Sequence, residues 1–581
     1  MTSPRVAGAL RPPEPPPEAS QPGAIVWLRK NLFFSVGSSV LTLVLGAIIL
    51  VGLRAVLGFV FAEDRLWEVI PRNATNYAVG TYPRSELERV WLSLHIVFFL
   101  SGVSTAVWRP TGLTSVARIS AGFRALGITL LLVGILAPAS FGWHLLVLVA
   151  GAVLVLATVL VDRNLASDAV VERIPIQAVL AGAVVAFLVL VWVLPIDAST
   201  KVPLTVGVAV GVVGHLLGRV ISARVPSGML RAVMVGAWLI SLPVIYLHVQ
   251  RRPQVDWDTV TGPWLPWIAG VIVGGALVIW VVSRSDRERA GVINALLVVA
   301  AAAVWAIDAP MLGRALVFLL AVVSLATPTF GSSDASRRKI LWAWFGLALF
   351  ATYLFVVGDA GTGLDTRNEY YGGMNLTLML AVGSLLLSFP MGVTLALGRT
   401  STMPIFRLLS TGYIELVRGV PLITLLFIAR FGIFNFLPPA FDPDPNVLVL
   451  GGFTLFSAAY LAENVRGGLQ SIPRGQYEAA KALGMTTAQM TMLITLPQAL
   501  RAVIPAIVGQ VIALFKDTSL VAIVGLAEFF RVARDVVPNQ PTSLGSILEN
   551  LIFAAAVYWV FTYNFSRASQ RLERKLGVGT R

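Results

Sequence analysis

Residues 464–497 read NVRGGLQSIPRGQYEAAKALGMTTAQMTMLITLP, a polar to amphipathic stretch that separates two apolar runs at 447–463 and 500–527. An apolar run of about 20 residues is long enough to cross a bilayer as a helix. Pro473 predicts the start of a new helix inside the stretch, and Pro497 predicts the end of the segment before the next span. We therefore expect a short helix along the membrane surface that docks into a groove of another protein.

Small side chains favour this docking, because they let another surface approach the backbone closely. We expect Ala480 and Gly484 to lie one turn apart on one flank of the helix. Glu478 is expected in the first turn, where the helix dipole favours an anion. The alternative is an ordinary amphipathic helix at the membrane interface.

Apolar runs of the same kind recur along the whole chain of 581 residues. Hydrophobic residues make up 56% and charged residues 13%, about half the charged share of a globular protein. This composition excludes a soluble enzyme, a coiled coil or intrinsic disorder for most of the chain. It predicts an all-α polytopic membrane protein with about sixteen transmembrane helices, at 33–61, 91–108, 123–141, 143–161, 176–195, 202–222, 229–249, 264–283, 290–307, 309–328, 340–358, 374–398, 420–437, 447–463, 500–527 and 549–566.

The basic residues predict the orientation. Five alternate loops are rich in arginine. The other loops form the outside set, and the first of them spans 62–90. After that first loop, the only basic residues of the outside loops are Lys201, Arg251, Arg252 and Arg367. Because cytoplasmic loops carry the excess of Lys and Arg, we expect a multi-pass protein of the cell membrane with both termini in the cytoplasm. The net charge of +14 is explained in this way without a nucleic-acid partner. The Pro-rich residues 1–31 and the final residues 572–581 are predicted to be cytoplasmic tails, the first of them disordered.

The sequence offers little catalytic chemistry. It contains no cysteine and four scattered histidines, which are expected to be packing or interface residues: His95, His144, His215 and His248. No GxxxxGK[ST], HExxH or GxSxG pattern occurs. We expect no metal site, no cofactor bound by this chain and no enzymatic activity of the chain in isolation.

The surface segment matches EAA-x3-G-x9-I-x-LP at every fixed position, which are Glu478, Ala479, Ala480, Gly484, Ile494, Leu496 and Pro497. It resembles the EAA loop of the inner-membrane permease subunits of ABC importers. Three flanking stretches resemble the amino-acid branch of that family: IELVRGVPLITLLF (414–427), AAYLAENVRGGL (458–469) and LFKDTSLVAIVGL (514–526). Together with NYAVGTYPRSELERVW (76–91), they are most similar to the larger permease subunit of general L-amino-acid transporters.

This resemblance implies a five-helix ABC type I permease core at 373–571, preceded by a transmembrane extension of about eleven helices at 32–372. It implies a permease for polar or general L-amino acids that alternates between inward and outward access. The implied partners are two ATPase subunits that carry ATP and Mg and receive the seven motif residues, an identical or different second permease subunit, an extracytoplasmic solute-binding protein and membrane lipid.

Polar residues within spans are candidates for the substrate path, because charges at membrane depth are costly. The candidates are Glu463, Arg430, Lys516, Asp517, Thr518 and Ser519. An internal ion pair between Lys516 and Asp517 that only shapes a bend is the alternative for the last four, and Arg430 could instead extend to the outer surface. Glu415 and Arg418 are expected to be structural charges at the cytoplasmic interface.

Two other classes remain open from the residues alone. An ion-coupled secondary transporter predicts inverted repeats and clustered intramembrane carboxylates, and neither is seen in the sequence. A non-transporting membrane scaffold is the third possibility. The N-terminal extension is rich in small-residue runs such as GVAVGVVGHLLG (207–218), which suit close helix packing.

Overall fold

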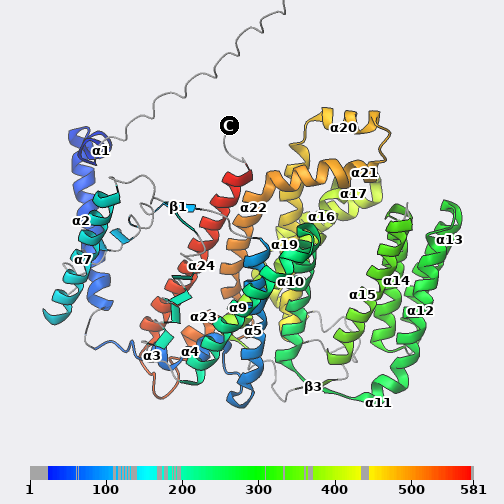
Figure 1. The fold of residues 1–581 in the computed structure, drawn as a ribbon, viewed down its shortest axis with the longest axis horizontal. Coiled ribbons are helices and arrows are strands. Elements are labelled where there is room, and N and C mark those ends of the chain that lie inside the picture. The colour runs from blue at the N-terminus through cyan, green and yellow to red at the C-terminus, as the bar shows by residue number, and fades with distance from the viewer. Residues whose placement is uncertain are drawn as a thin grey trace, which may run out of the picture. The chain divides into compact units, whose positions relative to one another are not determined.

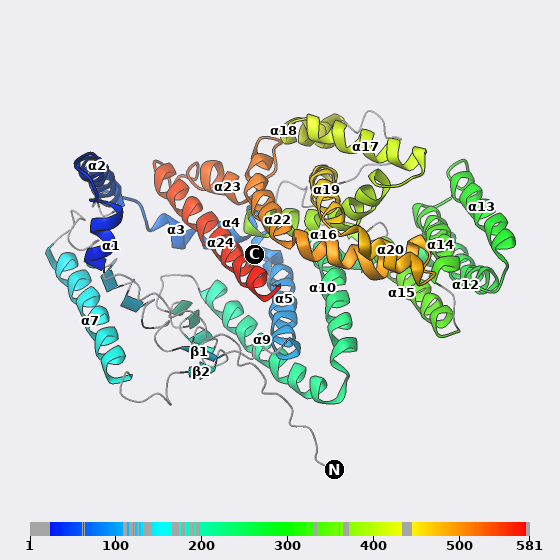
Figure 2. The same ribbon diagram turned by 90° about the horizontal axis from the view of Figure 1, so that it is seen from above.

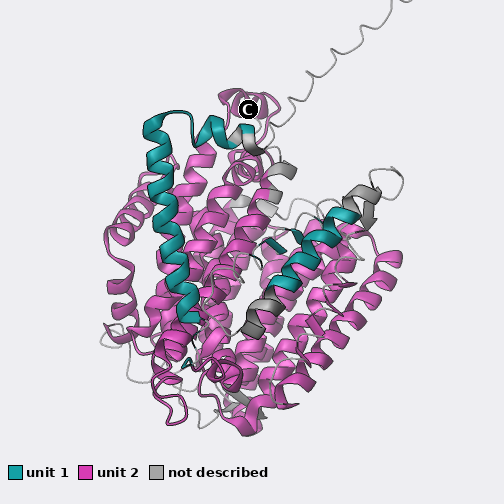
Figure 3. Ribbon diagram, turned by 90° about the vertical axis from the view of Figure 1, so that its left-hand side faces the viewer, with its two compact units in different colours: residues 1–65, 113–175 teal, residues 66–112, 176–581 magenta. Residues whose placement is uncertain are grey.

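The computed structural model of the chain divides into two compact units, which Figure 3 colours separately. Unit 1 comprises residues 1–65 and 113–175, and unit 2 comprises residues 66–112 and 176–581. The residues that the structure describes are 24–60, 62, 64–108, 113–115, 120, 123–124, 127–128, 131, 141–165, 173–175, 181–182, 184–185, 187–188, 191–192, 198–307, 309–330, 334–358, 361–363, 371–432 and 444–576.

Unit 1 contains three described helices and a short antiparallel strand pair. The helices are α1 (Ala24–Asn31), α2 (Val36–Val60) and α7 (Phe141–Leu165), and the strands are β1 (Leu113–Ser115) and β2 (Arg173–Pro175). Because α1 is helical, the last part of the predicted disordered tail is ordered; residues 1–23 lie outside the described part of the chain.

Unit 2 begins with a run of helices that holds one further strand pair, β3 with β4 (Figure 1). Its elements up to β4 are α3 (Val69–Arg72), α4 (Ala74–Val79), the 3-10 helix η1 (Arg84–Glu86), α5 (Leu87–Val107), α9 (Ala198–Arg224), α10 (Ser227–Gln250), β3 (Arg251–Val255), α11 (Trp257–Thr259), the π-helix η2 (Val260–Trp264), α12 (Leu265–Val282), α13 (Arg287–Ala303), α14 (Met311–Phe330), α15 (Asp334–Gly358) and β4 (Gly361–Gly363).

The rest of unit 2 contains the surface segment predicted from the sequence. Its elements are α16 (Gly373–Arg399), α17 (Pro404–Gly419), α18 (Leu422–Phe427), the π-helix η3 (Ile428–Gly432), α19 (Pro445–Gln470), α20 (Arg474–Ala482), α21 (Thr487–Met490), the π-helix η5 (Thr491–Thr495), α22 (Leu496–Asp517), the 3-10 helix η6 (Thr518–Ala522), α23 (Phe529–Arg531), the π-helix η7 (Val532–Val536) and α24 (Ile547–Leu576).

The helices confirm the predicted all-α polytopic fold. Among the described residues, ten helices are long and apolar enough to cross a membrane, or eleven if α17 and the α18–η3 helix form one span bent by 104°. Three more predicted spans fall on α7, α13 and α24, and α13 ends at Ala303 rather than at 307. The predicted spans 123–141 and 176–195 lie mostly outside the described residues.

Glycines let α5 and α9 pack closely, as Figure 2 shows from above. A methyl group added at Gly102 of α5 would lie 1.9 Å from the carbonyl oxygen of Gly211 of α9. His95 and His215 also lie in this contact. A ring nitrogen of His95 is within hydrogen-bond distance of the Pro203 carbonyl oxygen, and one of His215 is within that distance of the Thr105 hydroxyl oxygen. The run at 207–218 is therefore a packing surface, as its small residues predict.

A second bundle within unit 2 consists of α12 to α15, which lie together in both ribbon views (Figures 1 and 2). Its centre is Trp344, which is fully buried and donates its indole N–H to the carbonyl oxygen of Ile272 at 2.9 Å. The bonded indole N–H satisfies the one polar group of a large apolar side chain.

The C-terminal core packs α16 against α19, and α19 against α22. Residues from far upstream belong to the same core. Val79, Tyr82 and Val90 are buried in one cluster with residues of α16, α18, α19 and α22, including Leu376, Leu380, Leu426, Phe453 and Leu514. The compact units therefore do not divide at the predicted boundary between 372 and 373, because residues 66–112 pack into the C-terminal core.

The connection between residues 66–112 and the C-terminal core depends on three glycines. The amide of Gly372 donates to the carbonyl oxygen of Val79 at 3.2 Å. The amide of Gly373 donates to the carbonyl oxygen of Ala527 at 2.7 Å. Gly80 and Gly373 have φ angles of 70° and 61°, a region that glycine enters without steric cost. Backbone segments from three distant parts of the sequence thus meet at the start of α16.

Candidate functional site

The helix of the surface segment, α20, begins where the sequence predicts. Pro473 is its N-cap residue and Arg474 is its first residue. The helix ends at Ala482 in a turn in which the amide of Gly484 donates to the Lys481 carbonyl oxygen at 2.9 Å, and that of Met485 to the Ala480 carbonyl oxygen at 3.1 Å. These two bonds form a Schellman motif, whose left-handed residue is Gly484 with φ 73°.

This turn corrects two predictions about the segment. Gly484 lies beyond the end of α20, so it is not one helical turn from Ala480, and it terminates the helix instead of lining its flank. Glu478 lies past the first turn, which contains no acidic residue. The fixed glycine of the motif is therefore explained by backbone conformation, since L-residues with side chains rarely adopt this φ.

The faces of α20 differ in exposure. Ala480 is buried, at 3%, whereas Glu478 and Ala479 are exposed, and α20 as a whole contacts η5. The rest of the segment follows as α21, η5 and α22, with a capping box between Thr486 and Gln489. Ile494 lies in η5, and Leu496 and Pro497 open α22, where proline needs no amide partner.

Large apolar side chains are exposed on this segment. Leu483 is 81% exposed, Leu493 67% and Met492 47%. Leu483 lies in the turn after α20, outside the candidate membrane spans, whereas Met492 and Leu493 lie in the candidate span Thr487–Ala522, where lipid can cover them. Exposed apolar side chains in water indicate a surface that a partner covers.

A charge cluster lies between α16, α17 and α19. The carboxylate of Glu463 accepts from Arg399 Nη1 at 2.6 Å and from Arg466 Nη2 at 2.8 Å, and Arg418 Nη1 lies 3.7 Å away. Arg399 also donates to Glu415 at 2.8 Å. Glu463 is not the end of its span, because α19 continues to Gln470. Three arginine partners favour a structural role over substrate contact.

Replacing Glu463 with alanine is expected to lower the free energy of unfolding by about 2 kcal/mol, because breaking a fully buried ion pair costs about 3–5 kcal/mol and this site is partly exposed. The matched control is Glu415→Ala, because Glu415 is 58% exposed and a surface pair contributes about 0–1 kcal/mol. Thermal unfolding in detergent measures both. An unchanged melting temperature with a raised KM for uptake would instead place Glu463 on the substrate path.

The candidate residues 516–519 lie where the α-helix of α22 changes to the 3-10 helix η6, at Thr518. The fully buried Thr518 hydroxyl donates to the Phe515 carbonyl oxygen at 2.7 Å, and the Ser519 hydroxyl donates to that of Lys516 at 2.8 Å. No ion pair joins Lys516 to Asp517, both of which are described, so the internal-pair alternative is not supported.

Lys516 and Ser519 both line a hollow of about 410 Å³ between the end of α22 and α24. The other side of the hollow includes Tyr558, Trp559 and Thr562. A cationic side chain, hydroxyl groups and aromatic rings at one place could hold the carboxylate and side chain of a small zwitterion. Asp517, which is half-buried, does not line this hollow.

Arg430 is separate from these groups. It lies in η3, is half-buried, and its guanidinium is 5.0 Å from the ring centroid of Phe431. The contact is a cation–π geometry within the helix. It does not bring Arg430 together with the residues at 516–519.

The sequence analysis missed a buried carboxylate, Glu528. It is fully buried and accepts from the amides of Phe530 and Arg531, both at 2.7 Å, and from the hydroxyl groups of Tyr558 and Thr377 at 3.3 and 3.5 Å. Burial raises the pKa of the Glu528 carboxyl to about 7, and these hydrogen bonds act in the opposite direction. A single acid directly after the apolar run 520–527 is the signal that could have identified it.

Residues 388–578 match the family described as binding-protein-dependent transport system inner membrane component. The chain is 40% identical over 264 residues to the inner membrane amino-acid ABC transporter permease protein YhdY of Escherichia coli (strain K12), a match that covers 45% of this chain and 71% of that protein. It is 48% identical over 212 residues to the glutamate/glutamine/aspartate/asparagine transport system permease protein BztC of Rhodobacter capsulatus, covering 36% of this chain and 49% of that protein.

A solved structure of an amino acid ABC transporter with histidines shares 30% identity, covers 35% of this chain and 92% of that chain, and has a TM-score of 0.32. The match to YhdY covers more than two thirds of that protein, and residues 388–578, which include the surface segment, match a family of transport permeases. The chain is therefore a member of the binding-protein-dependent transport system inner membrane component family, an amino-acid ABC importer permease.

Proposed function

We propose that the chain is the translocation subunit of a binding-protein-dependent importer for polar or general L-amino acids, and that a separate ATPase docks on the segment 464–497. The observation that carries this proposal is the 81% exposure of Leu483, directly after a helix whose C-terminal turn is fixed by the amides of Gly484 and Met485. A helix with an exposed apolar residue at its end can transmit a push from the ATPase to α19, which it follows directly, and to α22, which it reaches through α21 and η5.

In this proposal the ATPase dimer binds ATP and Mg, and its closure switches the bundle from inward to outward access. A second permease subunit completes the pathway, and an extracytoplasmic binding protein delivers the amino acid. The hollow at Lys516 and Ser519, between the end of α22 and α24, is the proposed contact for the amino acid. The relatives named above support an amino-acid substrate, because one is named an amino-acid permease and the other a permease for four polar amino acids.

The test is ATP-driven uptake in proteoliposomes that contain the chain, its ATPase, the second permease subunit and the binding protein. Leu483→Asp is expected to lower uptake and ATPase stimulation about thirtyfold or more, because a hot-spot side chain contributes about 2 kcal/mol or more to binding. Leu483→Met keeps the apolar contact and is the matched control. Gly484→Glu is a poorer test, since φ 73° strains the backbone whether or not a partner docks.

Unchanged uptake by Leu483→Asp, with normal membrane insertion, would contradict docking at this edge. Uptake that continues without any ATPase would instead support an ion-coupled secondary transporter. A complex that assembles normally but moves no amino acid would support a scaffold.

A further inference from the structure

The hollow at Lys516 and Ser519 has no hydrogen bonds between its own walls. The hydroxyl groups of Ser519 and Thr562, which line it, donate to carbonyl oxygens three and four residues earlier in the same helical segment. Among the described residues, no hydrogen bond joins two lining residues from different elements. Any polar connection between the walls therefore runs through groups outside the lining.

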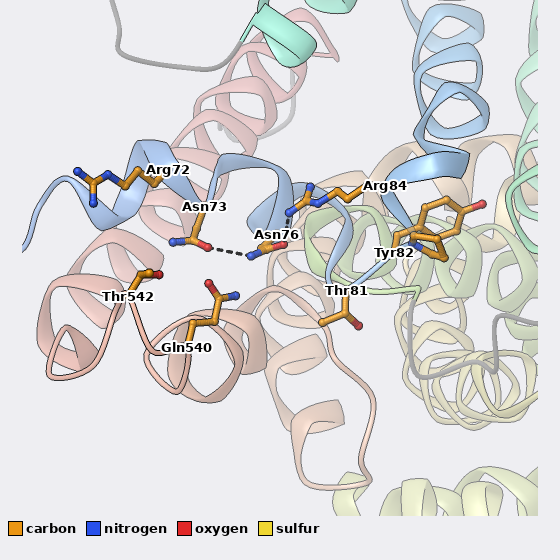
Figure 4. Close-up of a pocket in the computed structure, with 9 residues that line it drawn as sticks. Arg72, Asn73, Asn76, Thr81, Tyr82, Arg84, Gln540 and Thr542 are labelled. Carbon is orange, nitrogen blue, oxygen red and sulfur yellow. Dashed lines mark hydrogen bonds between the residues drawn. The ribbon is translucent and has the colours of Figure 1, made fainter.

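A second hollow, drawn in Figure 4, is built in the opposite way. Its volume is about 560 Å³, and its lining residues bond one another across neighbouring elements. Asn76 Nδ2 donates to Asn73 Oδ1 at 2.8 Å, and Arg84 Nη2 donates to Asn76 Oδ1 at 2.6 Å. The shape of this second hollow is therefore set by its own lining residues.

Two residues that line the first hollow, Phe530 and Tyr558, are joined through Glu528, which does not line it. Glu528 Oε2 accepts from the Phe530 amide at 2.7 Å and from the Tyr558 hydroxyl at 3.3 Å. Phe530 belongs to α23 and Tyr558 to α24, so one carboxylate oxygen connects two walls. The Tyr558 ring also packs on Phe515, with ring centroids 5.2 Å apart, so both its hydroxyl and its ring are held.

Glu528 is itself anchored on α16. The amide of the next residue, Phe529, donates to the Thr377 hydroxyl oxygen at 3.1 Å, and the same hydroxyl oxygen lies 3.5 Å from Glu528 Oε2. The backbone of Glu528 forms a parallel bridge with Gly373 at the start of α16. The other carboxylate oxygen, Oε1, accepts from the Arg531 amide at 2.7 Å. The two walls are therefore held from a point that is fixed on a third helix.

A buried carboxylate is a costly way to cap a short helix. Glu528 is fully buried, and its four donors are backbone amides and hydroxyl groups; among the described residues, no cationic side chain donates to it. Burial of a charge without a cationic partner lowers stability, whereas a serine or threonine could cap the helix without a charge. The additional effect of the carboxylate is to order two residues of the hollow.

We propose that Glu528 is a positioning residue for the amino-acid contact: it holds Phe530 and Tyr558 where both line the hollow, and it does not touch the amino acid. Because Glu528 is fully buried outside the lining, it acts through these two residues. A wall that is ordered in advance lowers the ordering cost of binding, so loss of this carboxylate weakens binding. The role rests on the proposed function, since it takes this hollow as the contact for the amino acid.

The test is equilibrium binding of radiolabelled L-glutamate and L-glutamine, in separate titrations, to the full-length chain with its ATPase and second permease subunit in nanodiscs. The binding protein is omitted, so that the dissociation constant reports the permease. At pH 8 the wild-type carboxylate is ionised, because burial raises the pKa of Glu528 only to about 7. Glu528→Gln is expected to raise the dissociation constant about tenfold and Tyr558→Phe about fivefold, since hydrogen bonds to charged groups are the stronger ones.

The double variant separates positioning from direct contact. If the Tyr558 hydroxyl acts only through Glu528, then Glu528→Gln combined with Tyr558→Phe raises the dissociation constant about as much as Glu528→Gln alone. Glu549→Gln removes another buried carboxyl group, on α24 but outside the hollow, and is expected to leave binding unchanged. Tyr413→Phe, which removes a tyrosine hydroxyl bond between α17 and α19, is the second matched control with the same expectation.

Unchanged binding in Glu528→Gln would overturn this role, even if the melting temperature fell, because the residue would then serve stability alone. Tyr558→Phe keeps the ring, so unchanged binding in that variant would overturn the role even if Glu528→Gln did not fold. An effect of the double variant equal to the product of the two single effects would place the Tyr558 hydroxyl on the amino acid itself and refute positioning.

Two further outcomes separate this inference from the proposed function. If Lys516→Gln left binding unchanged while the reconstituted importer still took up amino acids, the hollow would not be the contact. The positioning role would then be refuted, and the importer function would stand. If Glu528→Gln and Lys516→Gln both weakened binding but the wild-type importer moved no amino acid, the role at the hollow would stand and the importer function would be refuted.

Discussion

Gly372→Ala is expected to lower the stability of the permease core by about 2–4 kcal/mol. A methyl group at this position would lie 2.1 Å from the Ala527 carbonyl oxygen, which is part of the backbone and cannot rotate away. The same carbonyl accepts the Gly373 amide, so relief of the clash breaks that bond. Overpacking costs about 1–3 kcal/mol and a lost backbone hydrogen bond about 1 kcal/mol, which together are a large part of the stability of a domain.

The measurement is the monodisperse fraction after detergent extraction, together with the melting temperature. Gly451→Ala is the matched control, because Gly451 lies inside α19 and an added methyl group would meet no atom within 4 Å. Alanine is favoured over glycine in a helix by about 1 kcal/mol, so the control is expected to be neutral or stabilising. Normal assembly of Gly372→Ala would contradict the close approach of residues 79–80, 372–373 and 527.

The sequence predicted features that depend on neighbouring residues. The apolar runs predicted the long helices, and Pro473 predicted the start of α20. The polar residues at 516–519 are a local signal of the same kind, and the helix type changes within them at Thr518. The contact between Glu463 and Arg466 was also predictable, since residues three apart share a helix face.

Contacts between distant segments were not predictable in this way. Arg399 and Arg418 reach Glu463 from two other helices, and no local pattern encodes that meeting. The packing of residues 76–91 into the C-terminal core depends on glycine contacts across nearly 300 residues of sequence. The role of Gly484 was missed because a small residue was interpreted as part of a docking face, whereas its positive φ angle is visible only in the folded backbone.

The thermal stability of the chain is expected to fall as the pH rises from about 5 to 7, through Glu528. Burial raises the pKa of this carboxyl from 4.5 to about 7, so the folded state keeps a proton that the unfolded state has already lost. Unfolding then releases a proton, and each pH unit in this window costs up to about 1.4 kcal/mol of stability. The contribution of the protonated Glu528 to stability is complete below the pKa that this carboxyl has in the unfolded state. It is lost once the pH passes the pKa of the folded state.

Glu528→Gln is expected to remove this slope, because the amide does not titrate. The neutral side chain can still accept from one of the amides of Phe530 and Arg531, so the fold is expected to persist. Asp535→Asn is the control: the Arg534 hydrogen bond lowers the pKa of the Asp535 carboxyl, so its contribution is lost only at acidic pH below this window. Melting temperatures from pH 5 to 8 in one detergent measure all three proteins. An equal slope in wild type and Glu528→Gln would show that the four donors around the carboxylate outweigh its burial and keep Glu528 ionised.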